Sequence, residues 1–125
     1  MNVKIDTKEK FNVISPEATA LTANMTEELI VLLLPYLQKD IPHIILKMIL
    51  VDSMEDEACR KLADVQQKFY DSNCSFVICE LKQATEEQMD NLALLEVLNI
   101  TPTESEAWDI VQMEEIEREL MGDED

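Results

Sequence analysis

The sequence contains very little glycine and histidine and few positive charges. Its 125 residues include one glycine, one histidine and 10 lysines and arginines, against 27 aspartates and glutamates. A single glycine excludes the glycine-rich phosphate loops of dinucleotide-binding and Walker-type sites. The formal net charge of −17 repels phosphate backbones and anionic lipid headgroups. We therefore expect neither nucleic-acid binding nor direct membrane binding.

The sequence also has no long apolar run and no basic leader. The longest aliphatic stretch covers residues 29–34, is interrupted by Pro35, and is much shorter than the roughly 20 residues that span a bilayer. Acidic and polar residues continue through Glu17 before any apolar run, which is unlike a secretory signal. These features predict a cytoplasmic protein.

The cysteines and the single histidine form no evident catalytic or metal-binding pattern. Three cysteines cannot all pair, which fits a reducing compartment, and their spacing matches no zinc site. For Cys59, which is followed by Arg60 and Lys61, a reactive thiol of lowered pKa is one alternative and a packed thiol is the favoured one. His43 has no nucleophile beside it in the sequence, so a structural role is expected. We expect no catalysis, metal or other cofactor.

The composition that is present suits one packed domain. Hydrophobic residues make up 46% of the chain, and 125 residues are enough for one core. We expect a single domain over residues 1–121 and a frayed acidic tail over residues 122–125.

Five short apolar segments are typical of β-strands. Residues 3–5 and 11–14 alternate or nearly alternate apolar and polar side chains, which predicts a hairpin. Residues 44–51 and 76–79 are apolar almost throughout, as in central strands covered on both faces. A further short strand is expected near residues 97–100.

Four helices are predicted among these strands. Capping boxes are expected at Asn24, Thr85 and Thr103, whose side-chain oxygens would accept a helix amide. In the first two, Glu27 and Gln88 are the residues expected to reach back to the start of their own helix. Another helix follows the acidic residues 52–57 and runs to about Tyr70. Strands that alternate with helices imply parallel pairing, so we predict an α/β fold with a mixed sheet of about five strands and four main helices. The last helix is expected to turn one apolar side inward: Ala107, Ile110, Val111, Met113, Ile116 and Leu120.

The order of these elements resembles the STAS family, named after sulphate transporters and anti-sigma-factor antagonists, and particularly the antagonists. The resemblance runs from about residue 11 to residue 120. Residues 43–46 and 76–79 resemble two central strands of the family, residues 92–98 resemble its late helix-to-strand segment, and residues 104–107 resemble the start of its last helix. The resemblance implies a non-enzymatic protein-binding module that takes part in regulation of transcription.

The STAS family carries an Asp-Ser-Ser/Thr-Gly motif at the start of its second helix. A partner kinase that is itself an anti-sigma factor phosphorylates the first serine. Aligned without gaps, this motif falls on residues 55–58, where Asp56 replaces the serine. An alternative placement on Asp52 and Ser53 needs three extra residues before the next strand and lacks both the second hydroxyl and the glycine. We favour the ungapped placement.

The resemblance therefore implies a degenerate phosphorylation site with one fixed charge. A carboxylate carries about one negative charge, whereas phosphoserine carries nearly two. The simpler alternative is that three acidic residues merely favour a helix start. Ser53 is the remaining candidate phosphoacceptor, and a serine-kinase-like anti-sigma factor is the implied partner. The expected partner-binding residues are Ser53, Met54, Glu55, Asp56, Glu57 and Ala58.

Two other functions stay open from the resemblance. STAS domains also occur in membrane transport complexes, so the chain is alternatively a soluble accessory subunit of such a complex. The second alternative is a domain that binds a small ligand or nucleotide, although the negative charge argues against anionic ligands.

The last predicted helix offers two further features. Trp108 is expected to pack on the sheet, with an interface anchor as the alternative. An acidic face is either simply solvated or steers a basic partner. The residues of this face are Asp109, Gln112, Glu115 and Glu119 together with the tail residues 123–125.

Overall fold

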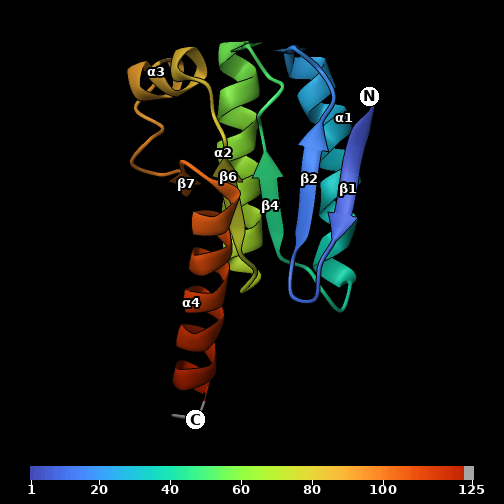
Figure 1. Cartoon of the computed structure of the whole chain (residues 1–125), viewed down its shortest axis with the longest axis vertical. Helices are drawn as coiled ribbons and strands as arrows, with labels where there is room; N and C mark the ends of the chain where they lie inside the picture. The colour runs from blue at the N-terminus through green and yellow to red at the C-terminus, as the bar shows by residue number, and fades with distance from the viewer. Residues whose placement is uncertain (123–125) are drawn as a thin grey trace.

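The protein folds around a mixed five-stranded sheet, as predicted (Figure 1). The computed structural model describes residues 1–122, so residues 123–125 of the expected acidic tail lie outside the described residues. The spatial order is β1-β2-β4-β6-β7, in which only β1 and β2 are antiparallel. The strands are β1 (Val3–Thr7), β2 (Asn12–Pro16), β4 (Ile44–Lys47), β6 (Phe76–Cys79) and β7 (Ile100–Thr101).

The central strand β4 is shorter than the apolar run that predicted it. Only Ile44–Lys47 pairs with β6, because β6 itself has four residues. The chain then turns, and the amide of Val51 donates to the carbonyl of Met48 at 3.0 Å. Met48 and Val51 are fully buried although they are outside the strand. The apolar run at residues 44–51 therefore covers a strand and the turn that follows it, and both contribute buried side chains to the same core.

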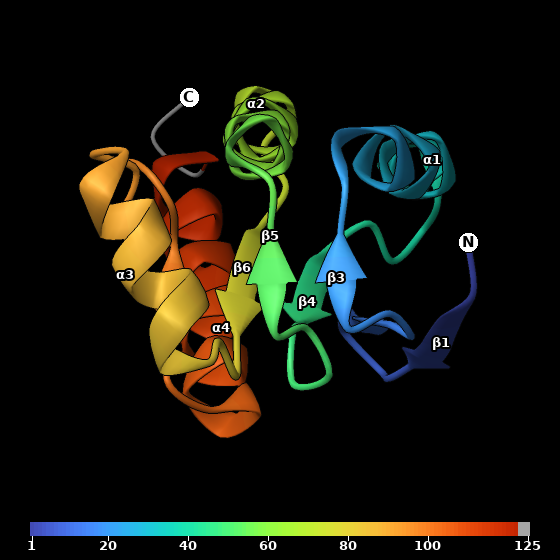
Figure 2. The same cartoon turned by 90° about the horizontal axis from the view of Figure 1, so that it is seen from above.

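The helices form layers on both faces of the sheet. Seen from above, α1 (Ala23–Leu33) and α2 (Asp56–Asp71) lie side by side on one face (Figure 2). The larger core lies between them and the sheet. A 3₁₀ helix, η1 (Leu34–Gln38), continues α1 and contains Pro35.

The last two helices complete the fold. The short helix α3 (Gln83–Asn91) lies near the start of α2, and α4 (Glu104–Gly122) packs on the opposite face of the sheet. Ala107 and Val111 of α4 are fully buried in the second core. No helix within residues 1–122 is both long enough and apolar enough to cross a bilayer.

Two of the three predicted capping boxes are wrong in position. The first helix begins after Thr22, whose Oγ1 accepts the amide of Met25 at 3.1 Å, and not after Asn24. The third helix begins after Lys82, so Thr85 lies inside it and donates its hydroxyl to the Lys82 carbonyl. In each case the helix starts two or three residues earlier than the capping pattern indicated.

The last predicted cap is confirmed, but the predicted inward side of the last helix is only partly right. Thr103 Oγ1 accepts the amide of Glu106 at 3.2 Å, as expected for a cap. Trp108 packs against Phe11, with the two ring centroids 6.3 Å apart, but its side chain remains 42% exposed. Three residues expected in the core are instead exposed, because they project from the side of α4 opposite to the buried Ala107 and Val111: Met113, Ile116 and Leu120.

Candidate functional site

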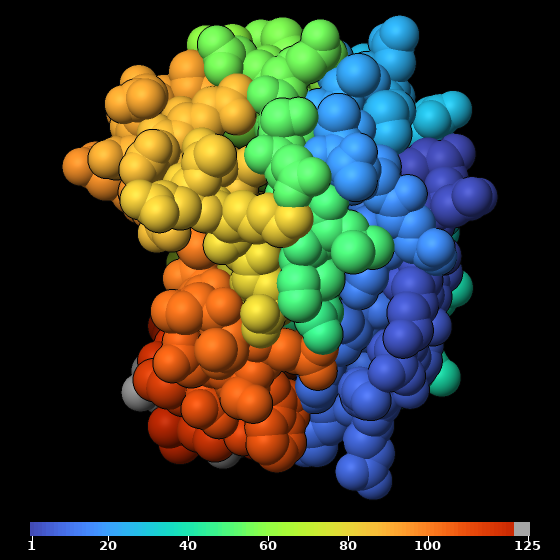
Figure 3. Space-filling view, turned by 45° about the horizontal axis from the view of Figure 1, so that its top comes forward, coloured from blue at the N-terminus to red at the C-terminus, as the bar shows by residue number. Residues whose placement is uncertain are grey.

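The residues expected to bind a partner lie at one end of the molecule, where a second small sheet leads into α2. This sheet pairs β3 (Ala20–Leu21) in parallel with β5 (Ser53–Met54), a pairing that was not predicted. The amides of Asp52 and Ser53 both donate to the Thr19 carbonyl, at 2.7 and 3.2 Å. In Figure 3, the green segment that enters α2 lies between the blue β3 region and the yellow α3 region.

The six expected residues divide into a surface group and two anchors. Met54 and Ala58 are buried in the larger core, at 7% and 0% exposure. The other four side chains are exposed: Ser53, Glu55, Asp56 and Glu57. The buried pair fixes the backbone, and the exposed group presents three carboxylates to solvent.

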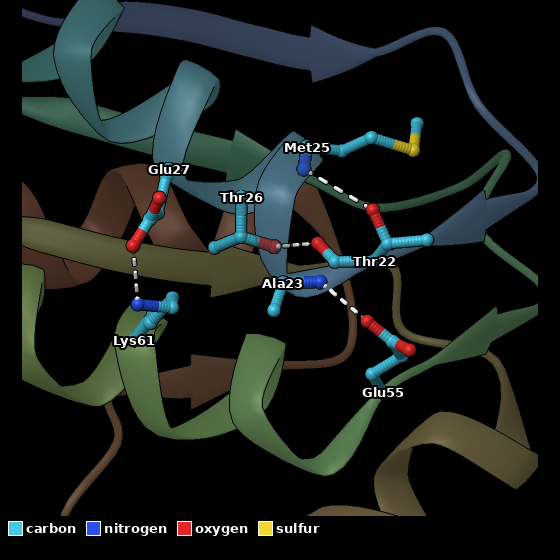
Figure 4. Close-up of polar contacts among 7 residues, drawn as sticks. All are labelled: Thr22, Ala23, Met25, Thr26, Glu27, Glu55 and Lys61. Atoms are coloured by element: carbon cyan, nitrogen blue, oxygen red, sulfur yellow. Dashed lines mark hydrogen bonds and ion pairs between the residues drawn. The ribbon is translucent and has the colours of Figure 1, made fainter.

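Glu55 joins the starts of two helices (Figure 4). It is the N-cap residue of α2, yet its Oε1 accepts the amide of Ala23, the first residue of α1, at 2.6 Å. Its own amide donates to the Leu21 carbonyl at 3.0 Å. One turn further on, Lys61 of α2 pairs with Glu27 of α1 at 2.8 Å. These contacts hold the two helix starts in a fixed relative position.

Because Glu55 is used by α1, the start of α2 is stabilised in another way. Among the described residues, no side chain caps the first amides of α2, but its first turn contains Asp56 and Glu57. Carboxylates at this position interact favourably with the positive end of the helix dipole. Glu57 Oε1 also accepts from Arg60 at 2.9 Å on the exposed surface.

Asp56 is oriented by Gln88, a residue that no local sequence pattern connects with this site. Gln88 of α3 donates its Nε2 to the Met54 carbonyl at 2.6 Å and to Asp56 Oδ1 at 2.8 Å. The predicted capping box assigned Gln88 a local role at the start of its own helix. Its partners are more than 30 residues away in sequence, so only the topology reveals them. An ion pair between Lys82 and Asp52 makes a second link between the α3 start and this end.

The nearby cysteine is packed and not activated. Cys59 is fully buried, and burial, assisted by the charge of Asp56, raises the pKa of its thiol to about 11. The favoured sequence interpretation is therefore confirmed, and the alternative of a lowered pKa is wrong. Cys79 is also fully buried, and burial raises its pKa to about 12.

His43 has the structural role that was expected. Its Nδ1 accepts the amide of Ser75 at 3.0 Å, which ties the residue before β4 to the residue before β6. Burial lowers the pKa of His43. Within the described part of the chain, no three His, Cys, Asp or Glu side chains gather as metal ligands.

Comparison with known proteins identifies the fold. No protein-family model and no curated protein matches the sequence. An anti-sigma-factor antagonist (STAS) domain protein of Planctomyces limnophilus matches with a TM-score of 0.75 and 16% identity, over 88% of this chain and 97% of that one. A candidate anti-sigma factor antagonist of Thermotoga maritima matches with a TM-score of 0.74 and 16% identity, over 88% and 94%. The chain thus has a STAS-like α/β fold.

The same fold is found in part of a much larger protein. The murine Solute Carrier 26 family member A9 anion transporter matches over 83% of this chain but only 18% of its own, with a TM-score of 0.69 and 12% identity.

Proposed function

We propose that this chain is a protein-binding module without catalytic activity, similar in role to an anti-sigma-factor antagonist. It binds a regulatory protein through the α2 entry surface, defined as residues 53–58. The observation that carries this proposal is the acidic, exposed start of α2 on a backbone held by both neighbouring helices. A surface that is already ordered loses little conformational entropy when a partner docks.

The proposal includes a permanent charge at the docking surface. Asp56 is the first residue of α2, the place where the resemblance expects the phosphorylated serine. Its carboxylate supplies about one negative charge that no kinase or phosphatase changes. Ser53, the other candidate acceptor, belongs to β5 and precedes the helix by three residues. We therefore propose that binding is not controlled by serine phosphorylation at this surface.

The chemistry of the surface defines the partner. Glu55, Asp56 and Glu57 are consecutive, and a partner with Lys or Arg side chains opposite them has complementary charge. A serine-kinase-like anti-sigma factor with such a basic surface is the proposed partner class. Since the carboxylates are exposed, salt should weaken the complex.

Charge reversal at this surface tests the proposal. The immobilised chain is first used to capture its partner from the native cells, and the affinity of the purified pair is then measured by calorimetry. The double variant Asp56→Lys/Glu57→Lys should weaken binding by at least about tenfold, as expected for loss and inversion of two interface charges. Asp71→Lys, an exposed charge reversal at the other end of α2, is the matched control and should leave the affinity unchanged. Equal affinity for both variants would remove the α2 entry surface from the function.

Intact mass spectrometry tests the regulatory part separately. The chain purified from native cells should carry no phosphate, and Ser53→Ala should bind the partner as tightly as the original protein. Phosphate on Ser53, lost in Ser53→Ala, would overturn the proposed absence of phosphorylation control while leaving the docking surface in place.

A second candidate function is supported by the transporter match. The fold likeness to part of an anion transporter favours a subunit that docks on a membrane transport assembly. Sedimentation of the chain with membranes, abolished by protease treatment of those membranes, would favour this alternative. A partner found entirely in the soluble fraction would favour the regulatory module.

A further inference from the structure

The outer face of α4 carries an apolar stripe that this chain does not cover. Met113, Ile116 and Leu120 are 59%, 56% and 63% exposed. Their spacing of three and four residues places them on one side of the helix, with the heptad spacing of a helix-packing seam. Ala107 and Val111, which pack on the sheet, project from the opposite side. The helix therefore has two apolar faces, of which only one is buried.

The stripe is held in a fixed position. Arg118, on the inward side of α4, donates its Nη2 to Ser75 Oγ at 3.0 Å. Glu114, one turn earlier, lies 3.9 Å from the same guanidinium and is half-buried. These contacts attach the second half of α4 to the body of the protein, although it extends past the strands (Figure 1). A partner would meet an ordered helix.

The charges beside the stripe select the partner. Glu117 and Glu119 are exposed and occupy the positions that flank a heptad seam formed by residues 113, 116 and 120. Two copies of this stripe packed antiparallel would place glutamate against glutamate across the seam, which is unfavourable. The net charge of −17 adds to this repulsion. A seam flanked by Lys or Arg has complementary charge.

We propose that the stripe of Met113, Ile116 and Leu120 binds an amphipathic helix of another protein, in which basic residues flank an apolar seam. The second half of α4, which carries the stripe, lies at the end of the molecule opposite to the start of α2 (Figure 1). Binding here is therefore independent of the proposed function and compatible with it. The acidic face for which steering of a basic partner was one alternative lies on this same helix, where Asp109 and Glu119 are exposed.

Three synthetic helical peptides test the proposal with the full-length chain. The first has Leu and Ile at the seam and Lys at the flanks, the second has the same seam with Glu flanks, and the third has Lys flanks with a Ser seam. In fluorescence anisotropy, the first peptide should bind at least about tenfold more tightly than either of the others. Binding of the Ser-seam peptide as strong as that of the first peptide would show attraction by charge alone and would overturn the proposal.

Variants of the chain locate the binding. Ile116→Ser/Leu120→Ser should weaken binding of the first peptide by at least about tenfold, as expected when buried apolar contacts are lost. Both side chains are exposed in the free chain, so circular dichroism should show unchanged folding. Val31→Ser is the matched control, because Val31 is a 72% exposed apolar residue on α1. Asp56→Lys should also leave peptide binding unchanged, which separates this result from that of the α2 entry surface.

Two further outcomes would assign the stripe to another occupant. Concentration-dependent dimers in analytical ultracentrifugation that disappear in Ile116→Ser/Leu120→Ser would show that a second copy covers it. Binding to uncharged phosphatidylcholine vesicles that is lost in the same variant would show a lipid surface. Either result overturns the proposal. A chain that stays monomeric and does not bind these vesicles supports it.

Discussion

The side chains of Asn12 and His43 make hydrogen bonds that connect separate segments of the chain. Asn12, which is 1% exposed, donates its Nδ2 to the carbonyls of Ile41 and His43 at 2.7 and 3.2 Å. His43 in turn accepts the amide of Ser75. The first residue of β2 and the residues just before β4 and β6 are therefore joined by side-chain hydrogen bonds. Such bonds matter because a buried polar group without a partner costs about 1–3 kcal/mol.

The titration of His43 should be visible in the stability of the protein. Burial and the charge of Arg118 lower its pKa below the ordinary 6.5, while Glu115 and Glu114 act in the opposite direction. Between the folded pKa and 6.5, the unfolded chain binds a proton that the folded chain does not, so His43 favours unfolding as the pH falls. Its stabilising contribution is fully present above pH 6.5 and is lost as the pH falls through the folded pKa.

A His43→Asn variant isolates this effect, because the amide oxygen of Asn can accept the Ser75 bond without titrating. On going from about pH 7.5 to about pH 5.5, the original protein should lose free energy of unfolding relative to the variant. Urea denaturation at the two pH values measures this difference. A constant difference between the two proteins would contradict the assigned direction of the pKa shift.

Helix starts differ from what local patterns predict because long-range contacts compete for the same side chains. Glu27 was expected to reach back to the start of its own helix, but it pairs with Lys61 of α2. Gln88 likewise contacts the start of α2. The cap at Thr103 is at the predicted position, where the Thr103 hydroxyl accepts the amide of Glu106 within its own helix.

Glu55 should contribute to stability through a helix other than its own. Glu55→Ala removes the acceptor for the amide of Ala23 and should lower the free energy of unfolding by about 1 kcal/mol, the usual effect of losing a cap. Glu55→Gln keeps a carbonyl acceptor and should lose less. Chemical denaturation of the three proteins provides the measurement. Equal losses in Ala and Gln would mean that charge, and not the hydrogen bond, is the source.

The kind and order of the main elements were predictable, because strand and helix patterns are local. Apolar runs located β4 and β6, and alternation identified the β1–β2 hairpin. The small β3–β5 sheet was missed because two-residue strands leave no periodic pattern. The burial of α4 was only half predicted, since its apolar residues are spread around the helix and only the side that faces the sheet is covered.

The candidate site was predictable as a segment but not as an arrangement. Residues 53–58 are consecutive in the sequence, so they are close together whatever fold the chain adopts. Their orientation depends on Ala23 and Gln88, which come from two other helices. No signal in a single sequence connects these positions.

At the scale of the whole molecule, the excess of negative charge opposes the compact state. Among residues 1–122, ion pairs occupy six of the basic side chains, but 10 bases cannot neutralise 27 acids. Most of these pairs are exposed and contribute little, about 0–1 kcal/mol each. Repulsion among the remaining carboxylates is the larger effect.

Added salt should therefore stabilise the protein. Screening reduces the general repulsion more than it weakens the exposed pairs, so the thermal unfolding midpoint should rise between about 0.01 M and 0.3 M sodium chloride. Differential scanning calorimetry measures the midpoint, and potassium chloride at equal ionic strength should act alike. A midpoint that falls with salt would show that the ion pairs outweigh the repulsion.

The second core has a consequence for the growing polypeptide. Phe11 and Val13 appear early during synthesis, whereas Ala107 and Val111, which cover them, come from the last helix. Until that helix has left the ribosome, one face of the nascent sheet remains an apolar surface open to chaperones and proteases. A chain whose synthesis stops before α4 keeps this surface exposed and can be bound by chaperones or cleaved by proteases. A chain that includes α4 buries the surface.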